Sequence, residues 1–274
     1  MFLNRSEGLA LALPAALFTT MVFLVPVAIL LSIAFQDGAG AFSLQGYVDF
    51  FAQPLNRSVF LRTLKLGILV AGTAAVIGYA AAFCIVNLPA TSRGRIFGLV
   101  VLPLMISPVA RTYAWIVILG RTGIVNDTIV GLGLSDTPIR LLFTETAVFI
   151  GLLQLFLPLM IISLVSAMEN IPKDVIPAAR VLGANWFQVF FKVILPLTRE
   201  GLVIGGTLVF TGALTAYITP AILGGSKVLM LETLLYQKVN VSNDFVSASV
   251  IAMILIVMCF SANLVLKRIA SVKG

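Results

Sequence analysis

Six long apolar stretches constrain the fold of this 274-residue chain more than any other feature of its sequence. A helix needs about 20 apolar residues to cross a bilayer, and every backbone polar group inside the lipid must be hydrogen-bonded within the protein. None of the stretches alternates polar and apolar residues with a period of two, which excludes the strands of a membrane barrel. We therefore predict six transmembrane helices at residues 9–35, 66–88, 96–120, 147–168, 201–224 and 245–266.

The composition indicates one all-α, polytopic membrane domain that covers residues 1–274. Hydrophobic residues make up 60% of the chain and charged residues 11%, whereas soluble domains carry about 25% charged residues. A soluble fold with this composition could not cover its surface with polar groups. The first apolar stretch is much longer than the ~7–15 residues of a signal-peptide core, so we expect a retained membrane anchor.

The residue types exclude several kinds of chemistry. The chain has no histidine, and its two cysteines, Cys84 and Cys259, lie far apart in apolar stretches. This excludes His-dependent catalytic triads and His/Cys zinc sites, so we predict no catalytic residues and no metal site. The sequence also lacks a G-x-x-x-x-G-K-[ST] loop, so the chain cannot hold nucleotide phosphates in the manner of a P-loop.

The basic residues indicate the orientation of the spans. With both termini in the cytoplasm, the inner segments carry more Lys and Arg than the outer ones, as the positive-inside rule requires. The segment 36–60 is then outside the cell membrane. We expect its aromatic residues, Phe42, Tyr47, Phe50 and Phe51, to form a belt at the membrane surface.

The segment 169–200 between the fourth and fifth spans is polar, yet it is patterned like helical structure. Pro177 suits the first turn of a helix, where a missing N–H costs nothing. Gly183 can adopt the left-handed conformation that ends a helix. Asn185 can cap a second helix, and we expect Pro196 to end it. The pattern predicts two short helices joined by a sharp turn on the cytoplasmic side.

Two interpretations of this helical pair are open from its periodicity. A short rigid helix between two spans would transmit the motion of a partner protein, which a loose loop would absorb. Alternatively, the pair forms an amphipathic hairpin that lies on the lipid. In that case its aromatic residues would hold it there, namely Trp186, Phe187, Phe190 and Phe191.

Three stretches carry a resemblance to a known family. The pattern A-A-x-x-x-G followed by I-L-P, from Ala178 to Pro196, resembles the cytoplasmic loop motif of ABC-type importer permeases. Residues 111–115 (RTYAW) and 135–144 (SDTPIRLLFT) are similar to the B subunit of spermidine/putrescine-type permeases. The resemblance covers nearly the whole chain. The family motif usually opens with Glu where this chain has Pro177, a change that removes the ion pair of that Glu and is compatible with the helix.

The resemblance implies a fold, a location and partners. The fold is the type I ABC importer permease fold, with six transmembrane helices in the bacterial cytoplasmic (inner) membrane and a cytoplasmic coupling helix between the fourth and fifth spans. The partners are a homologous second permease, two ATPase subunits, a periplasmic substrate-binding protein and membrane lipid, with no nucleic acid. ATP and Mg²⁺ would bind to the partner ATPases, and this chain would bind no cofactor. The residues expected to couple to the ATPase are Pro177, Ala178, Ala179, Arg180, Val181, Leu182, Gly183 and Asn185.

The third and fifth spans are the expected lining of a substrate pathway. They are irregular, because prolines and glycines interrupt them, and such residues are tolerated at membrane depth where backbone is buried or faces a cavity. The interrupting residues are Pro103, Pro108, Gly205, Gly206, Gly212 and Pro220. The candidate pathway residues are Arg111, Tyr113, Trp115, Tyr217 and Thr219.

Each candidate has an alternative structural role. Arg111 either contacts the substrate or ties itself to a carbonyl or a carboxylate, and it could snorkel outward. Arg111 and Trp115 share one helix face, whereas Tyr113 points largely the other way. The aromatic residues either hold an amine by cation–π attraction or simply fill the core.

The resemblance implies that the cargo is a small polar solute, most simply a polyamine such as spermidine or putrescine. No Asp or Glu lies deep in any predicted span, and Asp136 and Glu145 lie near the outer edge. Either the partner permease supplies carboxylates, or the cargo is an amino-phosphonate, a carboxylate or an amino-acid-like solute, which Arg111 would suit. A self-sufficient secondary transporter is the competing class, but the spans lack a carboxylate or histidine relay and the halves show no inverted repeat.

Overall fold

The computed structural model describes residues 13–36 and 40–271. Within these ranges the chain is helical, and the only pairing of extended backbone is an isolated antiparallel bridge between Gln36 and Phe42. The all-α prediction is therefore confirmed. The predicted location of both termini in the cytoplasm, and residues 9–12 of the first predicted span, lie outside the described residues.

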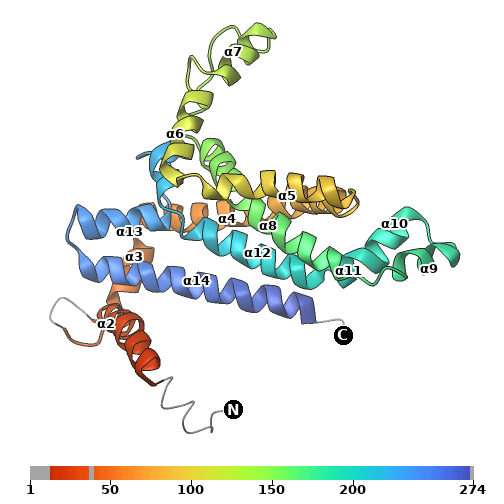
Figure 1. Cartoon of the computed structure of the whole chain (residues 1–274). Helices are drawn as coiled ribbons and strands as arrows, with labels where there is room; N and C mark the ends of the chain where they lie inside the picture. Colours follow the sequence, from red (N-terminus) through yellow and green to blue (C-terminus); the bar gives the residue numbers. More distant parts are fainter. Residues whose placement is uncertain (1–12, 37–39, 272–274) are drawn as a thin grey trace. The chain divides into compact units, whose positions relative to one another are not determined.

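The described helices follow in chain order in Figure 1. The first apolar helix, Leu13–Ile33, contains a π-helical turn η1 (Thr20–Leu24) and α2 (Val25–Ile33). The others are α3 (Gln45–Ala52), α4 (Pro54–Val86), α5 (Ala90–Met105), α6 (Pro108–Leu119), α7 (Ile124–Gly131), α8 (Glu145–Glu169), α9 (Val175–Val181), α10 (Trp186–Val189), η2 (Phe190–Ile194), α11 (Leu195–Leu197), α12 (Arg199–Leu214), η3 (Pro220–Gly224), α13 (Leu231–Asn240) and α14 (Phe245–Ser271).

Four helices of the described chain are long and apolar enough to cross a membrane, or up to six if each of two bent pairs counts as one span. The four are Leu13–Ile33, α4, α8 and Phe245–Arg268. Helix α4 begins at Pro54, well before the predicted start at residue 66. The part of α4 that precedes residue 66 carries Arg62 and Lys65, which both pair with the carboxylate of Glu145.

The third predicted span, 96–120, is not one helix. It breaks between α5 and α6, whose segments meet at 96°. Ile106 and Ser107 are extended at this point, because the ring of a proline excludes helical backbone from the residue before it. Pro108 then starts α6, where its fixed φ suits the first turn.

The fifth predicted span, 201–224, is also wrong as a single helix. Helix α12 ends at Leu214, and Pro220 begins the separate π-helical turn η3. Helix α12 is preceded by the helical segment Trp186–Leu197, from which it is bent by 66°. The two prolines of this region, Pro196 and Pro220, both lie in the first turn of a new helical segment.

The described chain divides into two compact units. The smaller comprises the described residues up to Arg57 together with Leu235–Ile254, and the larger comprises Ser58–Leu234 with the described residues from Leu255 onward. In the smaller unit, Phe50 is buried and meets Phe51 edge to face, with 5.1 Å between ring centroids. The prediction that Phe50 lies in a surface belt was therefore wrong, because α3 turns this ring inward.

The core of the larger unit is the packing of α8 against α12, which lie side by side in Figure 1. A Cβ atom on Gly201 would lie 2.4 Å from Cβ of Ala167, and one on Gly212 would lie 2.4 Å from the ring of Phe156. The Ser163 hydroxyl donates a hydrogen bond of 2.7 Å to the Gly201 carbonyl. Small residues thus let the backbones approach, as in other membrane helix pairs. Gly201, Gly205 and Gly212 serve this packing, and α12 stays helical through them.

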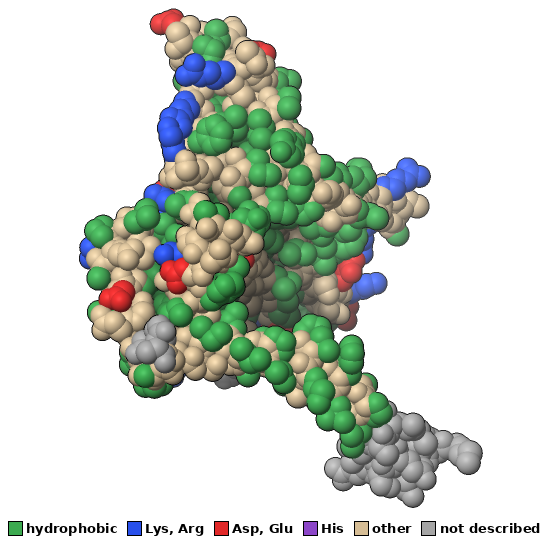
Figure 2. Space-filling model, turned by 90° about the vertical axis from the view of Figure 1, so that its left-hand side faces the viewer, with side chains coloured by type: hydrophobic (Ala, Val, Ile, Leu, Met, Phe, Trp, Pro, Cys, Tyr) green, Lys and Arg blue, Asp and Glu red, His purple; other side chains and the backbone are tan. Residues whose placement is uncertain are grey.

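On the face drawn in Figure 2, hydrophobic side chains are spread over the whole surface, and Lys and Arg form separate small groups. Large apolar side chains such as Phe18, Val76 and Val117 are exposed along the helices. Apolar surface on this scale is a liability in water and is satisfied by lipid or by other membrane subunits. The structure therefore agrees with a multi-pass membrane protein.

Candidate functional site

The segment that follows α8 folds as the sequence predicts. Helix α9 carries Pro177 as its third residue, where no intrahelical N–H bond is lost. Gly183 ends this helix with φ of +83°, in the left-handed region. The Asn185 side chain accepts a hydrogen bond from N–H of Gln188, and the Gln188 side chain accepts one from N–H of Asn185, which completes a capping box for α10.

The second helix was expected to end at Pro196, but its helical path includes Pro196 and ends at Leu197. The helical path continues through α10, η2 and α11 to Leu197 and bends at Thr198. The π-helical turn explains this continuation. The N–H of Leu195 donates to the carbonyl of Phe190, five residues earlier. The backbone hydrogen-bond pattern has therefore already changed from α-helical to π-helical before Pro196, which has no N–H to donate.

The aromatic residues of this segment divide between two environments. The rings of Trp186 and Phe190 pack edge to face on Phe83 and Tyr79 of α4, with centroids 5.2 and 5.3 Å apart. The Tyr79 hydroxyl also hydrogen-bonds the Thr198 hydroxyl at the bend. Phe187 and Phe191 are exposed. Two of the four aromatics therefore hold the segment on α4.

The tip of the segment presents apolar side chains. Val181 and Leu182, at the end of α9, are each 88% exposed. Arg180 lies 5.9 Å above the ring of Trp186, within the range of a cation–π contact. This contact joins α9 to α10 across the Gly183 turn, so the exposed pair stands on a braced helical hairpin.

An ion pair holds the C-terminal end of α8 to the start of α5. Arg93 Nη1 lies 2.9 Å from Glu169 Oε1, and Arg93 Nη2 donates a hydrogen bond of 2.6 Å to the carbonyl of Val86. Glu169 is the last residue of α8. The guanidinium therefore fixes the point from which the α9 segment departs.

Arg111 does not snorkel outward. It is 9% exposed, and its Nη1 donates a hydrogen bond of 2.9 Å to the carbonyl of Pro103. The same carbonyl accepts from N–H of Ile106. Arg111 thus bridges the break between α5 and α6 in the way that its structural alternative predicts.

The candidate pathway residues come together only in part. Thr219, just before η3, is buried with its hydroxyl oxygen 3.5 Å from that of Thr112 on α6. A Cβ on Gly151 of α8 would lie 2.6 Å from Cγ2 of Thr219, so three elements meet tightly here. Tyr113 is exposed and takes no part, because it lies on the opposite face of α6.

Two polar residues of this region were missed at the level of sequence. Trp115 Nε1 donates a hydrogen bond of 3.4 Å to Gln154 Oε1 on α8. Thr112 pairs with Thr219 and also donates to the carbonyl of Pro108. Both Thr112 and Gln154 are polar residues inside apolar stretches, which was the available signal.

The carboxylate at the start of α8 is already paired. Glu145 Oε1 lies 3.0 Å from Arg62 Nε, and Lys65 bonds the other oxygen. Arg62 also donates a hydrogen bond of 3.1 Å to the carbonyl of Leu229. Glu145 is therefore engaged by two cations and is not free for a cationic ligand.

Glu232, in the first turn of α13, is half-buried, and this burial raises the pKa of its carboxyl group.

In the part of the chain that the structure describes, no group of three or more His, Cys, Asp or Glu residues could hold a metal ion. The polar residues of the larger unit instead tie helices together at breaks and ends. The arrangement is built to hold helices in defined relative positions.

Comparisons with known proteins agree on one family. Residues 74–271 match the model of the family "Binding-protein-dependent transport system inner membrane component". The spermidine/putrescine transport system permease protein PotB of Haemophilus influenzae is 34% identical over 269 residues, which cover 93% of this chain and 94% of the relative. The putative 2-aminoethylphosphonate transport system permease protein PhnU of Salmonella choleraesuis is 25% identical over 261 residues, covering 93% and 90%.

A solved structure shares the fold. One chain in the crystal structure of a bacterial alginate ABC transporter, in complex with alginate pentasaccharide-bound periplasmic protein, matches with a TM-score of 0.80 at 18% identity. The match covers 96% of this chain and 93% of that one. The chain therefore shares its fold with that transporter chain over nearly its whole length.

Proposed function

The chain belongs to the family of binding-protein-dependent transport system inner membrane components, and from this membership we propose that it imports a polyamine, such as spermidine or putrescine, as one permease subunit of an ATP-driven importer. The amine class is supported by the relative that transports spermidine and putrescine, which matches over almost its whole length. A self-sufficient secondary transporter is at odds with this family.

The observation that carries the proposal is the braced hairpin of α9 and α10. Val181 and Leu182 are exposed at its tip, whereas its base is fixed by the Arg93–Glu169 ion pair and by the aromatic contacts with α4. Exposed apolar side chains on a rigid base can bind in a groove of a partner protein, and the base then transmits the partner's motion. We assign this hairpin to coupling with an ATPase subunit.

The contact residues proposed for this coupling are those expected from the sequence, Pro177, Ala178, Ala179, Arg180, Val181, Leu182, Gly183 and Asn185. ATP and Mg²⁺ bind to two partner ATPase subunits, and no cofactor binds to this chain. A homologous permease completes the pathway, and a periplasmic substrate-binding protein delivers the solute. Both termini and the α9–α10 hairpin lie in the cytoplasm.

In this proposal the import cycle is alternating access. ATP binding draws the ATPases together, and the hairpin moves with them. Because α8 and α12 flank the hairpin and pack closely on each other, its displacement tilts both helices as a unit. The break between α5 and α6 and the turn before η3, where Thr112 meets Thr219, are the proposed lining of the pathway.

An anionic amino-phosphonate is the second candidate cargo, because the 2-aminoethylphosphonate relative also matches most of the chain. Arg111 is the side chain that would suit the anionic group, but it is partly committed to the fold. Its Nη1 donates to the Pro103 carbonyl and the residue is buried, which favours the polyamine. Since Glu145 is also engaged, the carboxylates that a polyamine requires come from the partner permease or from elsewhere in this chain.

The test is uptake by the reconstituted complex in proteoliposomes, with the cognate binding protein outside and ATP inside. We expect ATP-dependent uptake of putrescine or spermidine, and none of 2-aminoethylphosphonate or small carboxylates. Uptake of the phosphonate alone would replace the polyamine assignment. Uptake without any ATPase subunit would overturn the importer assignment itself.

A further inference from the structure

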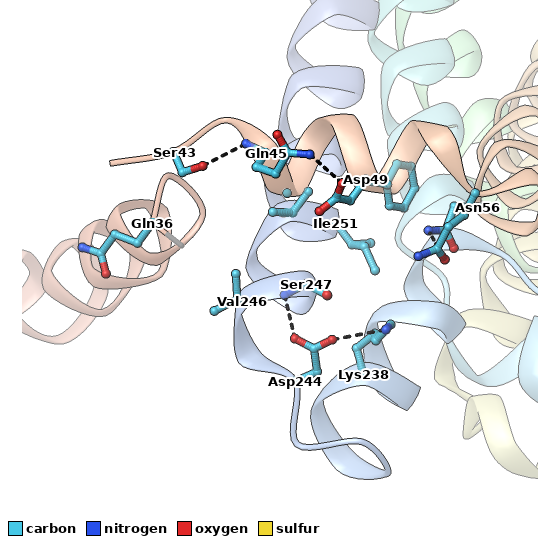
Figure 3. A pocket seen from close by; sticks show the side chains of 14 residues that line it. Gln36, Ser43, Gln45, Asp49, Asn56, Lys238, Asp244, Val246, Ser247 and Ile251 are labelled. Atoms are coloured by element: carbon cyan, nitrogen blue, oxygen red, sulfur yellow. Dashed lines mark hydrogen bonds and ion pairs between the residues drawn. The ribbon is translucent and has the colours of Figure 1, made fainter. Parts of the chain in front are cut away.

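The smaller unit contains a polar pocket that the coupling hairpin and the proposed pathway do not use. It has a volume of about 240 Å³ and is formed by α3, the first turn of α4, the end of α13 and the start of α14 (Figure 3). This is below the roughly 300–1,000 Å³ of pockets for drug-sized ligands, so a smaller ligand fits it. In the proposed topology the pocket is on the outer side of the membrane.

One side of the pocket carries a fixed ion pair. Lys238 Nζ lies 3.2 Å from Asp244 Oδ2, and the other oxygen of Asp244 accepts a hydrogen bond of 3.0 Å from N–H of Ser247. Asp244 thus caps α14. Burial raises the pKa of Asp244, but the hydrogen bonds from Ser247 and Lys238 outweigh it and lower the pKa below its usual value. Asp244 is held in its charged form.

The opposite side carries a second carboxylate, which is not neutralised. Asp49 of α3 accepts a hydrogen bond of 2.8 Å from Gln45 through Oδ1, and among the described residues no cation pairs with it. Figure 3 shows Asp49 on one side of the pocket, with Asp244 and Lys238 on the other. Two carboxylates against one ammonium leave the pocket with a net negative charge.

A buried amide also opens into this space. Asn56 is 6% exposed and lines the pocket, yet its side chain makes one hydrogen bond within the described residues, of 3.1 Å from Nδ2 to Gln53 Oε1. Its carbonyl oxygen is left as an acceptor. A buried polar side chain with unused capacity favours a ligand that donates hydrogen bonds.

The remaining wall is aliphatic and closely packed. Val246, Val250 and Ile251 of α14 face Phe50 of α3 around the pocket. A Cβ on Gly46 would lie 3.0 Å from Cγ2 of Val250, so α3 approaches α14 closely at this point. A lining that combines hydrogen-bond acceptors with hydrocarbon matches a ligand with a cationic donor on an alkyl chain.

We propose that this pocket binds the primary ammonium group of a small aliphatic amine, which Asp49 pairs with and Asn56 helps to orient. The outer location and the choice of amine rest on the proposed function. A protonated amine donates three hydrogen bonds and accepts none, and the open groups of the pocket include a carboxylate and an amide oxygen. Lys238 already makes this interaction with Asp244, using the ammonium group of the chain itself.

A lysine side chain of a partner protein has the same chemistry as a free amine. We assign the pocket to the free amine, because the cavity lies between helices and has an aliphatic wall that an alkyl chain can cover. The experiment separates the two sources by measuring amine binding without the binding protein and binding-protein association in a second arm.

The experiment measures equilibrium binding of radiolabelled putrescine to the purified full complex in nanodiscs, without ATP or binding protein. Asp49→Asn removes the unpaired charge and keeps the shape, and we expect roughly tenfold weaker binding, as for the loss of one charged hydrogen bond. Lys238→Met removes the competing cation, so binding should become about twofold to fivefold tighter. Asp49→Asn and Lys238→Met are thus expected to change putrescine affinity in opposite directions. A general folding defect would weaken binding in both.

Asp127→Asn is the matched control, because Asp127 of α7 is also exposed and lies outside the pocket. It should bind putrescine like the wild type, and 1,4-butanediol, which has no charge, should not compete. Equal binding by the Asp49→Asn and Asp127→Asn complexes would overturn the proposal. So would an Asp49→Asn complex that loses only its association with the binding protein. ATP-driven uptake tests the proposed function separately, since a complex can import polyamine with this pocket empty.

Discussion

Arg111 and Pro103 are joined across a break in the chain by a hydrogen bond of 2.9 Å from Nη1 to the proline carbonyl. The donor lies on α6 and the acceptor lies on α5, and the two segments meet at 96°. Pro108 and the residues before it interrupt the helix and so allow the bend. The hydrogen bond from the charged Arg111 side chain then stabilises it. This relationship gives Arg111 a role in positioning the helices beside the proposed pathway.

Replacing Arg111 tests that role. Arg111→Met should lower the free energy of unfolding by about 1 kcal/mol, the scale of a polar contact between membrane helices. For a chain of this size this lowers Tm by about 2–4 °C. Arg111→Lys keeps a shorter cationic donor, so its Tm should lie between those of the wild type and Arg111→Met. The measurement is thermal unfolding in detergent, and a change in solute preference with unchanged Tm would assign Arg111 to the cargo instead.

Gly183 provides a test of the coupling hairpin with little steric interference. A Cβ at this position would meet nothing within 4 Å, so a substitution strains only the backbone at φ of +83°. Gly183→Val should cost about 1–2 kcal/mol in that conformation, whereas Asn tolerates it. We expect the Val complex to assemble but to lose the stimulation of ATPase activity by the loaded binding protein, and Gly183→Asn to retain it. Full stimulation in the Val complex would refute the coupling role.

The cluster around Glu145 predicts a salt-dependent stability. Glu145→Gln leaves Arg62 and Lys65 without their shared carboxylate. Because the side chains are partly exposed, the expected loss is about 0.5–1 kcal/mol, and it should shrink at high ionic strength. Unfolding of Glu145→Gln, Lys65→Met and the double variant gives the coupling between the two positions. Additive effects would show that Lys65 contributes nothing through Glu145.

The local chemistry of the coupling hairpin could be predicted from sequence, because each signal acts within a few residues. Gly183 adopts the left-handed conformation, Asn185 forms its cap, and Pro177 lies in a first turn, all as expected. The end at Pro196 was misjudged because the π-helical turn of η2 shifts the hydrogen-bond ladder before the proline. Nothing in the residue pattern of 190–194 marks such a turn.

Contacts between distant segments could not be predicted in this way. The length of the apolar stretches placed the spans, but a proline marks a break without giving its angle, so the 96° bend at Ser107 inside the third span was missed. The partners of Arg111, Trp115 and Glu145 lie on other segments, and their identities depend on the packing of whole helices. Sequence reasoning singled out Arg111 and Trp115 as pathway candidates and placed Glu145 near the outer edge, but it left their partners open.

Acidification should weaken the cap of α14. Hydrogen bonds lower the pKa of Asp244 in the folded protein, despite the opposing effect of burial. A lowered folded pKa means that the stabilisation is complete above the usual carboxyl pKa of about 3.9 and is lost as the pH falls through the lowered value. Asp244→Asn should therefore be less stable than the wild type at pH 7, and the difference should shrink towards pH 3. A constant difference across this range would show that the charge of Asp244 is not involved.

The ion pair between Arg93 and Glu169 provides a separate test of how the hairpin is anchored. Their side chains meet at 2.9 Å, and Arg93 also donates to the Val86 carbonyl. Arg93→Glu and Glu169→Arg each place like charges together, and each should reduce the stimulation of ATPase activity while the complex still assembles. The double exchange restores opposite charges, but not the bond to Val86, so it should recover about 0.5 kcal/mol of stability and part of the stimulation. No recovery in the double variant would mean that the pair does not transmit motion from the hairpin, and that the aromatic contacts with α4 carry it alone.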